Sequence, residues 1–85
     1  MTLDIITPDQ TVFSGEVSSV TVPGTLGQFQ VLNNHAPIIS TLSKGDIKIK
    51  SAEGEQSFQT GPGVVEVLKN KIIVLVERVE NPQAS

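Results

Sequence analysis

The sequence predicts an all-β domain, an antiparallel β-sandwich of about eight to ten short strands. Apolar residues recur with a period of two, as they do in strands that bury one face. Glycine, proline, asparagine and aspartate interrupt the chain every few positions, at spacings typical of turns. No window of about eleven residues free of Gly and Pro carries apolar residues at the i, i+3, i+4 and i+7 positions of a helix. A β-barrel is the other architecture that such strands allow.

The first strands follow directly from the alternation. One is predicted at residues 3–6, closed by a Pro-Asp turn. Two more are predicted at residues 11–13 and 17–22, separated by the Ser-Gly pair at residues 14–15. The valines of the third strand are spaced first by three positions and then by two. A β-bulge near residues 18–19 would bring them onto one face.

The middle of the chain contains a loop and a polar elbow. Residues 23–27 are predicted to be a loop, because two glycines and a proline in five residues suit a strand poorly. Strands at residues 28–32 and 38–42 flank an Asn-Asn-His elbow that holds the only histidine, His35. The elbow is the most distinctive local feature of the sequence.

The second half of the chain alternates most regularly. The strand at residues 46–50 has two isoleucines on one face and two lysines on the other. Residues 61–63, Gly-Pro-Gly, are predicted to be a turn. Further strands are predicted at residues 55–59, 64–68 and 71–76, the last two joined by a tight hairpin at Lys69 and Asn70. The expected organisation is one β-sandwich domain, residues 1–80, with a polar C-terminal tail, residues 81–85.

Two segments, residues 64–65 and 72–76, are apolar on both faces of their strands. In a two-layer sandwich the outer face of each strand should meet water. Either the sheet curls so that loops cover these strands on both sides, or some of the outer residues lie under a protein partner. The sequence leaves both interpretations open.

Composition limits the classes of protein to consider. Eighty-five residues allow one domain with a small core. The net charge of −3, with no cluster of Lys and Arg, argues against nucleic-acid binding. The N-terminus has no signal-peptide pattern, and the longest apolar run is far shorter than the roughly 20 residues of a membrane span. A soluble chain without membrane insertion is expected.

No arrangement of side chains predicts a catalytic, metal or cofactor site. One histidine and no cysteine make the usual zinc sites implausible, and His35 in an Asn-rich turn is interpreted as structural. The loop at residues 23–27 lacks the Gly-Lys-Ser/Thr ending of a phosphate loop. Asp4 and Glu66 stand alone and are interpreted as solvated strand residues. The chain is not expected to be an enzyme or to bind a cofactor.

Several segments are informative through their order and spacing. The most specific is His35-Ala36-Pro37, followed by Leu42 and Gly45. Others are Leu3-Asp4-Ile5-Ile6-Thr7-Pro8 with Val12-Phe13-Ser14-Gly15, residues 17–24 with 27–32, and residues 61–67. Together they cover nearly the whole chain, which resembles the epsilon subunit of F-type ATP synthase, the central-stalk subunit called delta in mitochondria.

The resemblance implies a mechanical function. In that family a β-sandwich grips the gamma subunit and sits on the membrane rotor ring, coupling proton-driven rotation to the catalytic head. The subunit is non-catalytic and works at the cytoplasmic face of the bacterial plasma membrane. In most members a two-helix domain follows, whereas this chain resembles the sandwich alone, either as a naturally short member or as part of a longer protein. Without those helices, neither nucleotide binding nor arrest of ATP hydrolysis is expected.

The resemblance also assigns contact residues. Positions matching Thr7, His35 and Ser40 lie toward gamma in the family. The loop matching Thr25, Leu26, Gly27 and Gln28 approaches the rotor ring, and an acidic residue is common in the family where this chain has Gln28.

Two functions of other classes remain as alternatives. The first is a free-standing β-sandwich module that binds another protein. A glycan ligand is disfavoured because Trp and Tyr, the usual stacking platforms, are absent. The second is a small β-barrel enzyme, disfavoured by the scarcity of reactive side chains.

Overall fold

The computed structural model describes residues 1–80, which form nine strands and no helix. The strands are β1 (Thr2–Thr7), β2 (Gln10–Glu16), β3 (Ser19–Gly24), β4 (Gly27–Leu32), β5 (Ile38–Leu42), β6 (Gly45–Ser51), β7 (Gly54–Thr60), β8 (Gly63–Leu68) and β9 (Lys71–Val76). The prediction of an all-β sandwich is confirmed. The predicted tail, residues 81–85, lies outside the described residues, and the domain boundary at residue 80 stays a prediction.

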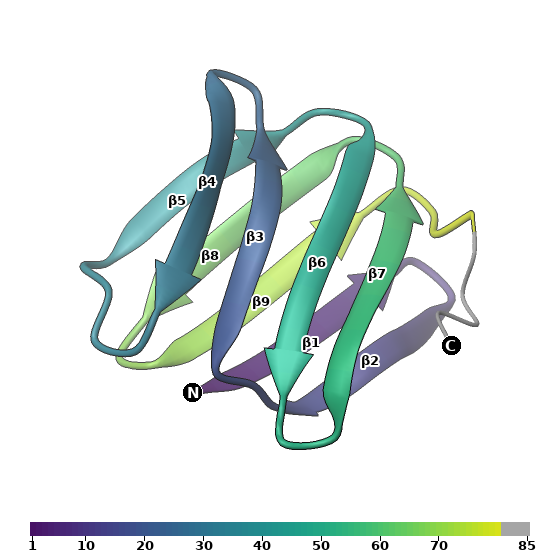
Figure 1. Ribbon diagram of the computed structural model, residues 1–85. Helices are drawn as coiled ribbons and strands as arrows, with labels where there is room; N and C mark the ends of the chain where they lie inside the picture. The colour runs from purple at the N-terminus through teal and green to yellow at the C-terminus, as the bar shows by residue number, and fades with distance from the viewer. Residues whose placement is uncertain (81–85) are drawn as a thin grey trace.

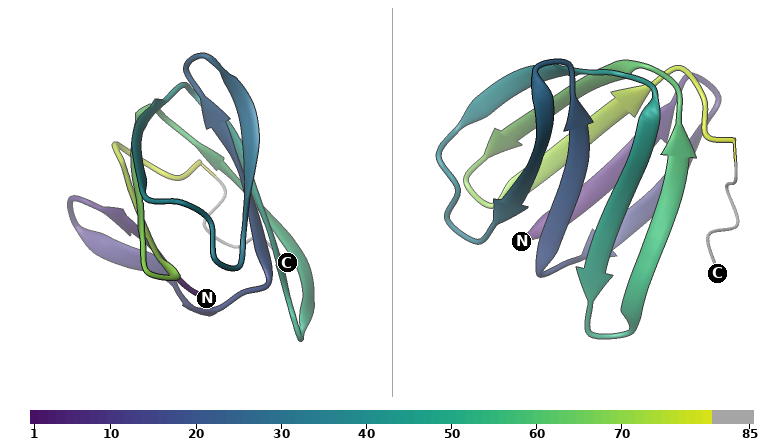
Figure 2. Two further views of the ribbon diagram at one scale, coloured as in Figure 1. Left: turned by 90° about the vertical axis from the view of Figure 1, so that its left-hand side faces the viewer. Right: turned by 45° about the horizontal axis from the view of Figure 1, so that its top comes forward.

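The strands lie in two layers that cross at an angle (Figure 1). The front layer contains β4, β3, β6 and β7, and the back layer contains β2, β1, β9, β8 and β5. The two layers join where Gly24 of β3 pairs with Leu42 of β5. Side views show the layers facing each other across the core (Figure 2).

One strand pair departs from the antiparallel pattern. β1 and β9 run parallel, with Leu3 beside Ile72 and Ile5 beside Val74, whereas the other pairings of the described strands are antiparallel. The first and last strands therefore lie side by side in the centre of the back layer. Local alternation carries no information about this pairing, because the partners are about seventy residues apart.

The core fills the space between the layers. Both layers contribute side chains that are almost completely buried, among them Leu3, Ile5, Val20, Ile47, Ile49, Phe58, Val65, Ile72 and Val74. The ring of Phe13 meets that of Phe58 edge to face, with centroids 6.0 Å apart. Each fully buried aliphatic side chain contributes about 1.5–3 kcal/mol, so this core accounts for most of the stabilisation of so small a domain.

Three predicted boundaries in the first half are wrong. β2 runs through Ser14 and Gly15 without a break, because Gly15 pairs with Leu3 and lies under the ring of Phe13. The segment at residues 23–27 is no loop: β3 extends through Gly24 and β4 starts at Gly27, which leaves a two-residue turn. Glycine and proline are tolerated here because they stand next to a hairpin turn.

At the bulge predicted near residues 18–19, Ser18 and Ser19 both oppose Lys50, and Val17 and Val20 are both buried in the core. The chain crosses from the back layer to the front layer at this point, and β3 starts only at Ser19. Val17 N donates to Met1 O (2.9 Å) and Ser18 N donates to Lys50 O (2.7 Å), which fixes the corner. A register shift that was not predicted lies between β1 and β2, where Ile5 faces Phe13 but Ile6 faces Thr11. β2 therefore carries the extra residue.

The predicted hairpin at Lys69 and Asn70 is confirmed. β8 and β9 pair from Gly63–Val76 to Leu68–Lys71 around a two-residue turn. Both turn residues have positive φ, 51° and 61°, as a type I′ turn requires.

Candidate protein-interaction surfaces

The outer face of the back layer carries a group of apolar side chains, with Glu66 among them. Leu75 of β9 pairs with Ile6 of β1 on one side and with Val64 of β8 on the other. Two residues along the strands, Ile73 of β9 pairs with Glu66 of β8, which in turn pairs with Ile39 of β5. Ile39, Leu68, Leu75 and Val64 are 77 %, 48 %, 47 % and 37 % exposed. We call this surface the apolar outer face; it comprises Ile6, Ile39, Val64, Leu68, Ile73 and Leu75.

The apolar outer face decides between the two interpretations of the doubly apolar strands. The layers do cross and curl, but within residues 1–80 no loop covers Val64 or Leu75. The interpretation that loops cover both sides is therefore wrong. Exposed large apolar side chains that adjoin across several strands are typical of an interaction surface.

A pocket of about 680 Å³ lies at one end of this face, where β1 ends and β8 begins. Ile6, Val64 and Leu75 line it, together with Pro62 and Thr7. The Thr7 hydroxyl lies 2.9 Å from Asp9 Oδ1 and 3.2 Å from Gln10 O, so it stabilises the turn after β1. Thr7 thus has a structural role at the rim of the apolar face.

A second hollow, of about 530 Å³, separates β4 from β5. We call it the β4–β5 groove. It is lined by Phe29, Ile38 and Ile39, and by five of the seven residues that the sequence assigned to contacts: Leu26, Gly27, Gln28, His35 and Ser40. The structure therefore brings residues of both predicted sets together, while Thr7 lies in the other pocket.

The β3–β4 hairpin presents Leu26 at its tip. This side chain is fully exposed. Thr25 N donates to Thr41 O (3.1 Å), and the hydroxyls of Thr25 and Thr41 are 2.7 Å apart, so β5 supports the turn. Thr25 consequently faces β5, and Leu26 is the member of the turn that is free to meet a partner.

His35 lies in the elbow between β4 and β5. Its backbone N donates to Leu32 O (3.1 Å), and its Nδ1 donates to Ala36 O at 2.7 Å. Asn34, with φ of 65°, is tied to Asn70 of the β8–β9 turn. The ring is half-buried against the groove, which agrees with a structural role.

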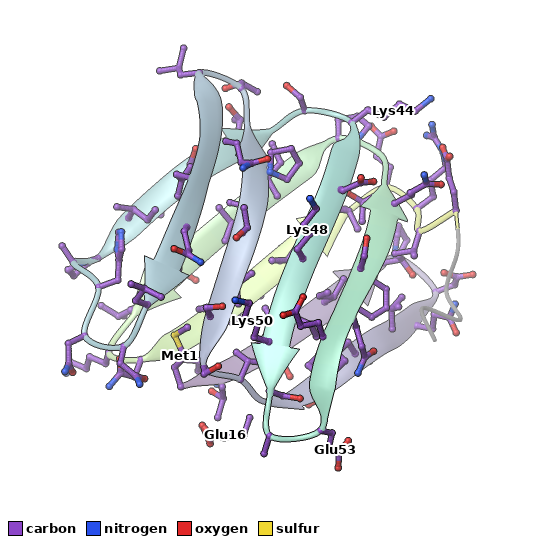
Figure 3. The ribbon with its side chains drawn as sticks, viewed as in Figure 1. Met1, Glu16, Lys44, Lys48, Lys50 and Glu53 are labelled. Atoms are coloured by element: carbon purple, nitrogen blue, oxygen red, sulfur yellow. The ribbon has the colours of Figure 1, made fainter. Side chains whose placement is uncertain are left out.

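The outer face of the front layer is polar. Lys48 and Lys50 project from β6 (Figure 3), between the Thr21 side of β3 and the Ser57 side of β7. Lys50 Nζ is 3.8 Å from Glu55 Oε2, and both side chains are mostly exposed. Exposed ion pairs contribute little to the stability of a protein. With its lysines and Glu55 mostly exposed, this face is a solvated surface. The two outer faces of the sandwich therefore differ in polarity.

The described residues offer little for catalysis. Within residues 1–80 no acidic or basic side chain is buried, and no group of three acidic or histidine side chains is placed to hold a metal ion. The same part of the chain has no helix long and apolar enough to cross a membrane. What the arrangement offers is contact area for other proteins.

Sequence reasoning missed two parts of this surface. Ile39 and Leu68 were not singled out, although the Ile38-Ile39 pair places one isoleucine on each face of β5 and was the available signal. The free edge of β4 was also missed, because the sequence does not reveal which strand edges stay unpaired.

A rigid all-β domain with two distinct apolar contact regions is typical of a subunit of a larger assembly. Residues 1–82 match the family model for the β-sandwich domain of the ATP synthase delta/epsilon chain. The chain belongs to this family of non-catalytic ATP synthase subunits.

Relatives agree with the assignment. The epsilon chain of Chlorobaculum tepidum is 47 % identical over 92 % of this chain and 90 % of its own length. The epsilon chain of Dehalococcoides mccartyi is 36 % identical over 95 % of this chain but 58 % of its own.

Two solved structures have the same fold. A chain of the Euglena gracilis mitochondrial ATP synthase matches 91 % of this chain and 50 % of its own length, with a TM-score of 0.84 at 18 % identity. A chain of the Tetrahymena thermophila mitochondrial ATP synthase, in a structure of the central stalk and c-ring, matches 92 % of this chain and 63 % of its own, with a TM-score of 0.78 at 18 % identity.

Proposed function

We propose that this chain is a rotor subunit of the central stalk of a proton-translocating ATP synthase, where it couples the membrane rotor ring to the gamma subunit. It works as a peripheral component at the cytoplasmic face of a bacterial plasma membrane. Family membership supports this function, and the relatives named above are epsilon chains of that enzyme.

The observation that carries the proposal is the apolar outer face. It brings exposed apolar side chains from β5, β8 and β9 onto one face, beside Ile6 of β1, and such a group is typical of a protein contact. Covering Leu75, Val64 and Ile39 would remove much of their remaining apolar surface from water, at about 25 cal/mol per Å². We assign this face to the gamma subunit, with Thr7 at its rim and His35 and Ser40 beside its β5 end.

The rotor ring takes a different surface. The turn residues Thr25 and Leu26, with Gly27 and Gln28, project from one end of the sandwich. The segment of residues 24–28 has no charge, so its contacts to the ring would be made by backbone groups, small polar groups and the Leu26 side chain. The gamma and ring contacts thus lie mainly on different parts of the sandwich and adjoin at Gln28, whose side chain is assigned to the ring.

The test is reconstitution with the gamma subunit of the same organism. The purified chain should form a stable complex with gamma, and it should restore proton-driven ATP synthesis to membranes depleted of it. A folded chain that neither binds gamma nor restores synthesis contradicts the proposal, and it would leave the free-standing binding module as the better reading.

A further inference from the structure

Three strands, β2, β4 and β7, pair with one neighbour only within residues 1–80, and two of them are protected; β5 pairs with β8 along its length and with β3 at Leu42 alone. β7 is covered over part of its length: Thr60 bridges to Val79, Gly61 N donates to Arg78 O (3.0 Å) and Glu80 N donates to Gln59 O (2.7 Å). β2 contains the extra residue of the β1–β2 register shift, and a bulge makes an edge a poor template for another strand. β4 has neither device.

The free edge of β4 can be located from its pairing with β3. Pro23 faces Gln28 in this pair, and it has no N–H to donate. The carbonyl of Pro23 accepts instead from Ser43 N (2.8 Å), so the Pro23–Gln28 pair is not hydrogen-bonded. The backbone groups of Gln28 therefore point away from β3.

The same direction recurs at every second residue. Hydrogen-bonded and non-hydrogen-bonded pairs alternate along an antiparallel ladder, and the β3–β4 register runs without a shift from Gly24–Gly27 to Ser19–Leu32. Leu32 obeys the rule, because its carbonyl accepts from His35 N and not from β3. The N–H and C=O groups of Gln28 and Gln30 thus point to the free edge of β4, where they have no strand partner among residues 1–80, and Gln28 also lines the β4–β5 groove.

The sequence of β4 makes an unpaired edge unfavourable. Gly27–Leu32 contains no charged residue and no proline, the usual means by which exposed edges avoid pairing. Phe29 turns its ring into the groove, where Ile38 and Ile39 face it from β5. A regular, uncharged, open edge beside an apolar groove is the geometry of strand addition.

From this edge we infer that an extended segment of the gamma subunit adds to β4 as a further strand. The inference rests on the proposed function. Backbone hydrogen bonds to Gln28 and Gln30 would fix its register, and apolar side chains at alternate positions would fill the groove over Phe29 and Ile38. Ile39 belongs both to the groove and to the apolar outer face, so one partner can cover the two surfaces without interruption.

The first experiment measures amide hydrogen exchange by NMR on the unaltered chain, alone and bound to gamma. The amides of Gln28 and Gln30 should exchange at least about tenfold more slowly in the complex, because they become hydrogen-bonded. The amides of Phe29 and Val31 already bond to β3 and serve as internal controls. If gamma binds and the exchange of Gln28 and Gln30 does not change, strand addition is wrong while the proposed function stands.

The second experiment compares two substitutions at one position. Gln30→Pro removes the outward N–H together with the glutamine side chain, and the β3 ladder keeps its hydrogen bonds because that N–H is not part of it. Gln30→Thr replaces the same side chain and keeps the N–H. Gln30→Pro should weaken gamma binding about tenfold, whereas Gln30→Thr should bind within about twofold of the unaltered chain.

The other possible outcomes of the two experiments separate strand addition, the identity of the partner and the proposed function. Equal binding by both variants overturns strand addition. If Gln30→Pro fails to fold, the exchange experiment decides alone. Protection that rises with the concentration of the isolated chain would show that a second copy occupies the edge, and it would overturn gamma as the occupant. No gamma binding by the unaltered chain would overturn the proposed function as well.

Discussion

Asn34 and Asn70 are joined by two hydrogen bonds although they lie 36 residues apart in the sequence. Asn34 N donates to Asn70 Oδ1 at 2.7 Å, and Asn70 Nδ2 donates to Asn34 Oδ1 at 3.3 Å. Both residues have positive φ, which asparagine tolerates better than most residues do. This contact ties the His35 elbow to the β8–β9 turn, so the end of the β4–β5 groove is fixed to the back layer.

Replacing Asn70 tests this tie. Asn70→Ala should lower the free energy of unfolding by about 1–2 kcal/mol, because alanine is strained at positive φ and Asn34 N loses its acceptor. Asn70→Asp keeps the acceptor for Asn34 N and should lose less. Urea denaturation measures the difference. Equal stability of the alanine variant and the unaltered chain would mean that the contact is not stabilising.

Gly63 is expected to tolerate no side chain. A Cβ added there would overlap Leu75 O and lie 2.8 Å from Val76 Cα, both of which belong to the neighbouring strand. Gly63→Ala should therefore lower the free energy of unfolding by about 3 kcal/mol. Gly15→Ala is the matched control, since its Cβ would meet the Phe13 ring at an ordinary 3.5 Å. Thermal melts of the two variants should differ clearly, and similar melting temperatures would contradict the packing described.

The alternation of apolar residues predicted nearly all strands because one face of each is buried. Glycine and proline were misleading guides to the ends of the strands. Pro23 and Gly24 belong to β3, since the hairpin has a turn of only two residues. The alternation could not predict the parallel contact of β1 with β9, which no local pattern encodes.

The candidate surfaces were predictable in part. The apolar residues on both faces of β9 indicated the outer face, because a strand with one solvated face would not carry them. The β4–β5 groove was not predictable. It depends on β4 pairing with β3 alone, which is a consequence of the assembled sandwich.

Leu75 should be required for binding gamma. Leu75→Glu places a charge in the middle of the apolar outer face, and it should weaken the complex by at least tenfold or so while changing the free energy of unfolding by less than about 1 kcal/mol. Thr21→Glu adds the same charge to the polar face beside Lys48 and should bind normally. Titration calorimetry with gamma distinguishes the two. Normal binding by Leu75→Glu would mean that gamma contacts another surface of the sandwich.

Leu26 should be required for the contact with the rotor ring. Its side chain is fully exposed at the tip of a turn that Thr41 supports, so it is free to contact a partner. Leu26→Asp should reduce proton-driven ATP synthesis several-fold while gamma, which contacts the apolar outer face, still binds; Leu26→Met, which keeps the apolar volume, should stay near normal. Because residues 24–28 carry no charge, the contribution of this contact to synthesis should change little with salt, unlike contacts made by exposed ion pairs, which are screened beyond about 8–10 Å. Normal synthesis by Leu26→Asp, or by a chain with residues 24–28 scrambled, would place the ring contact elsewhere on the sandwich.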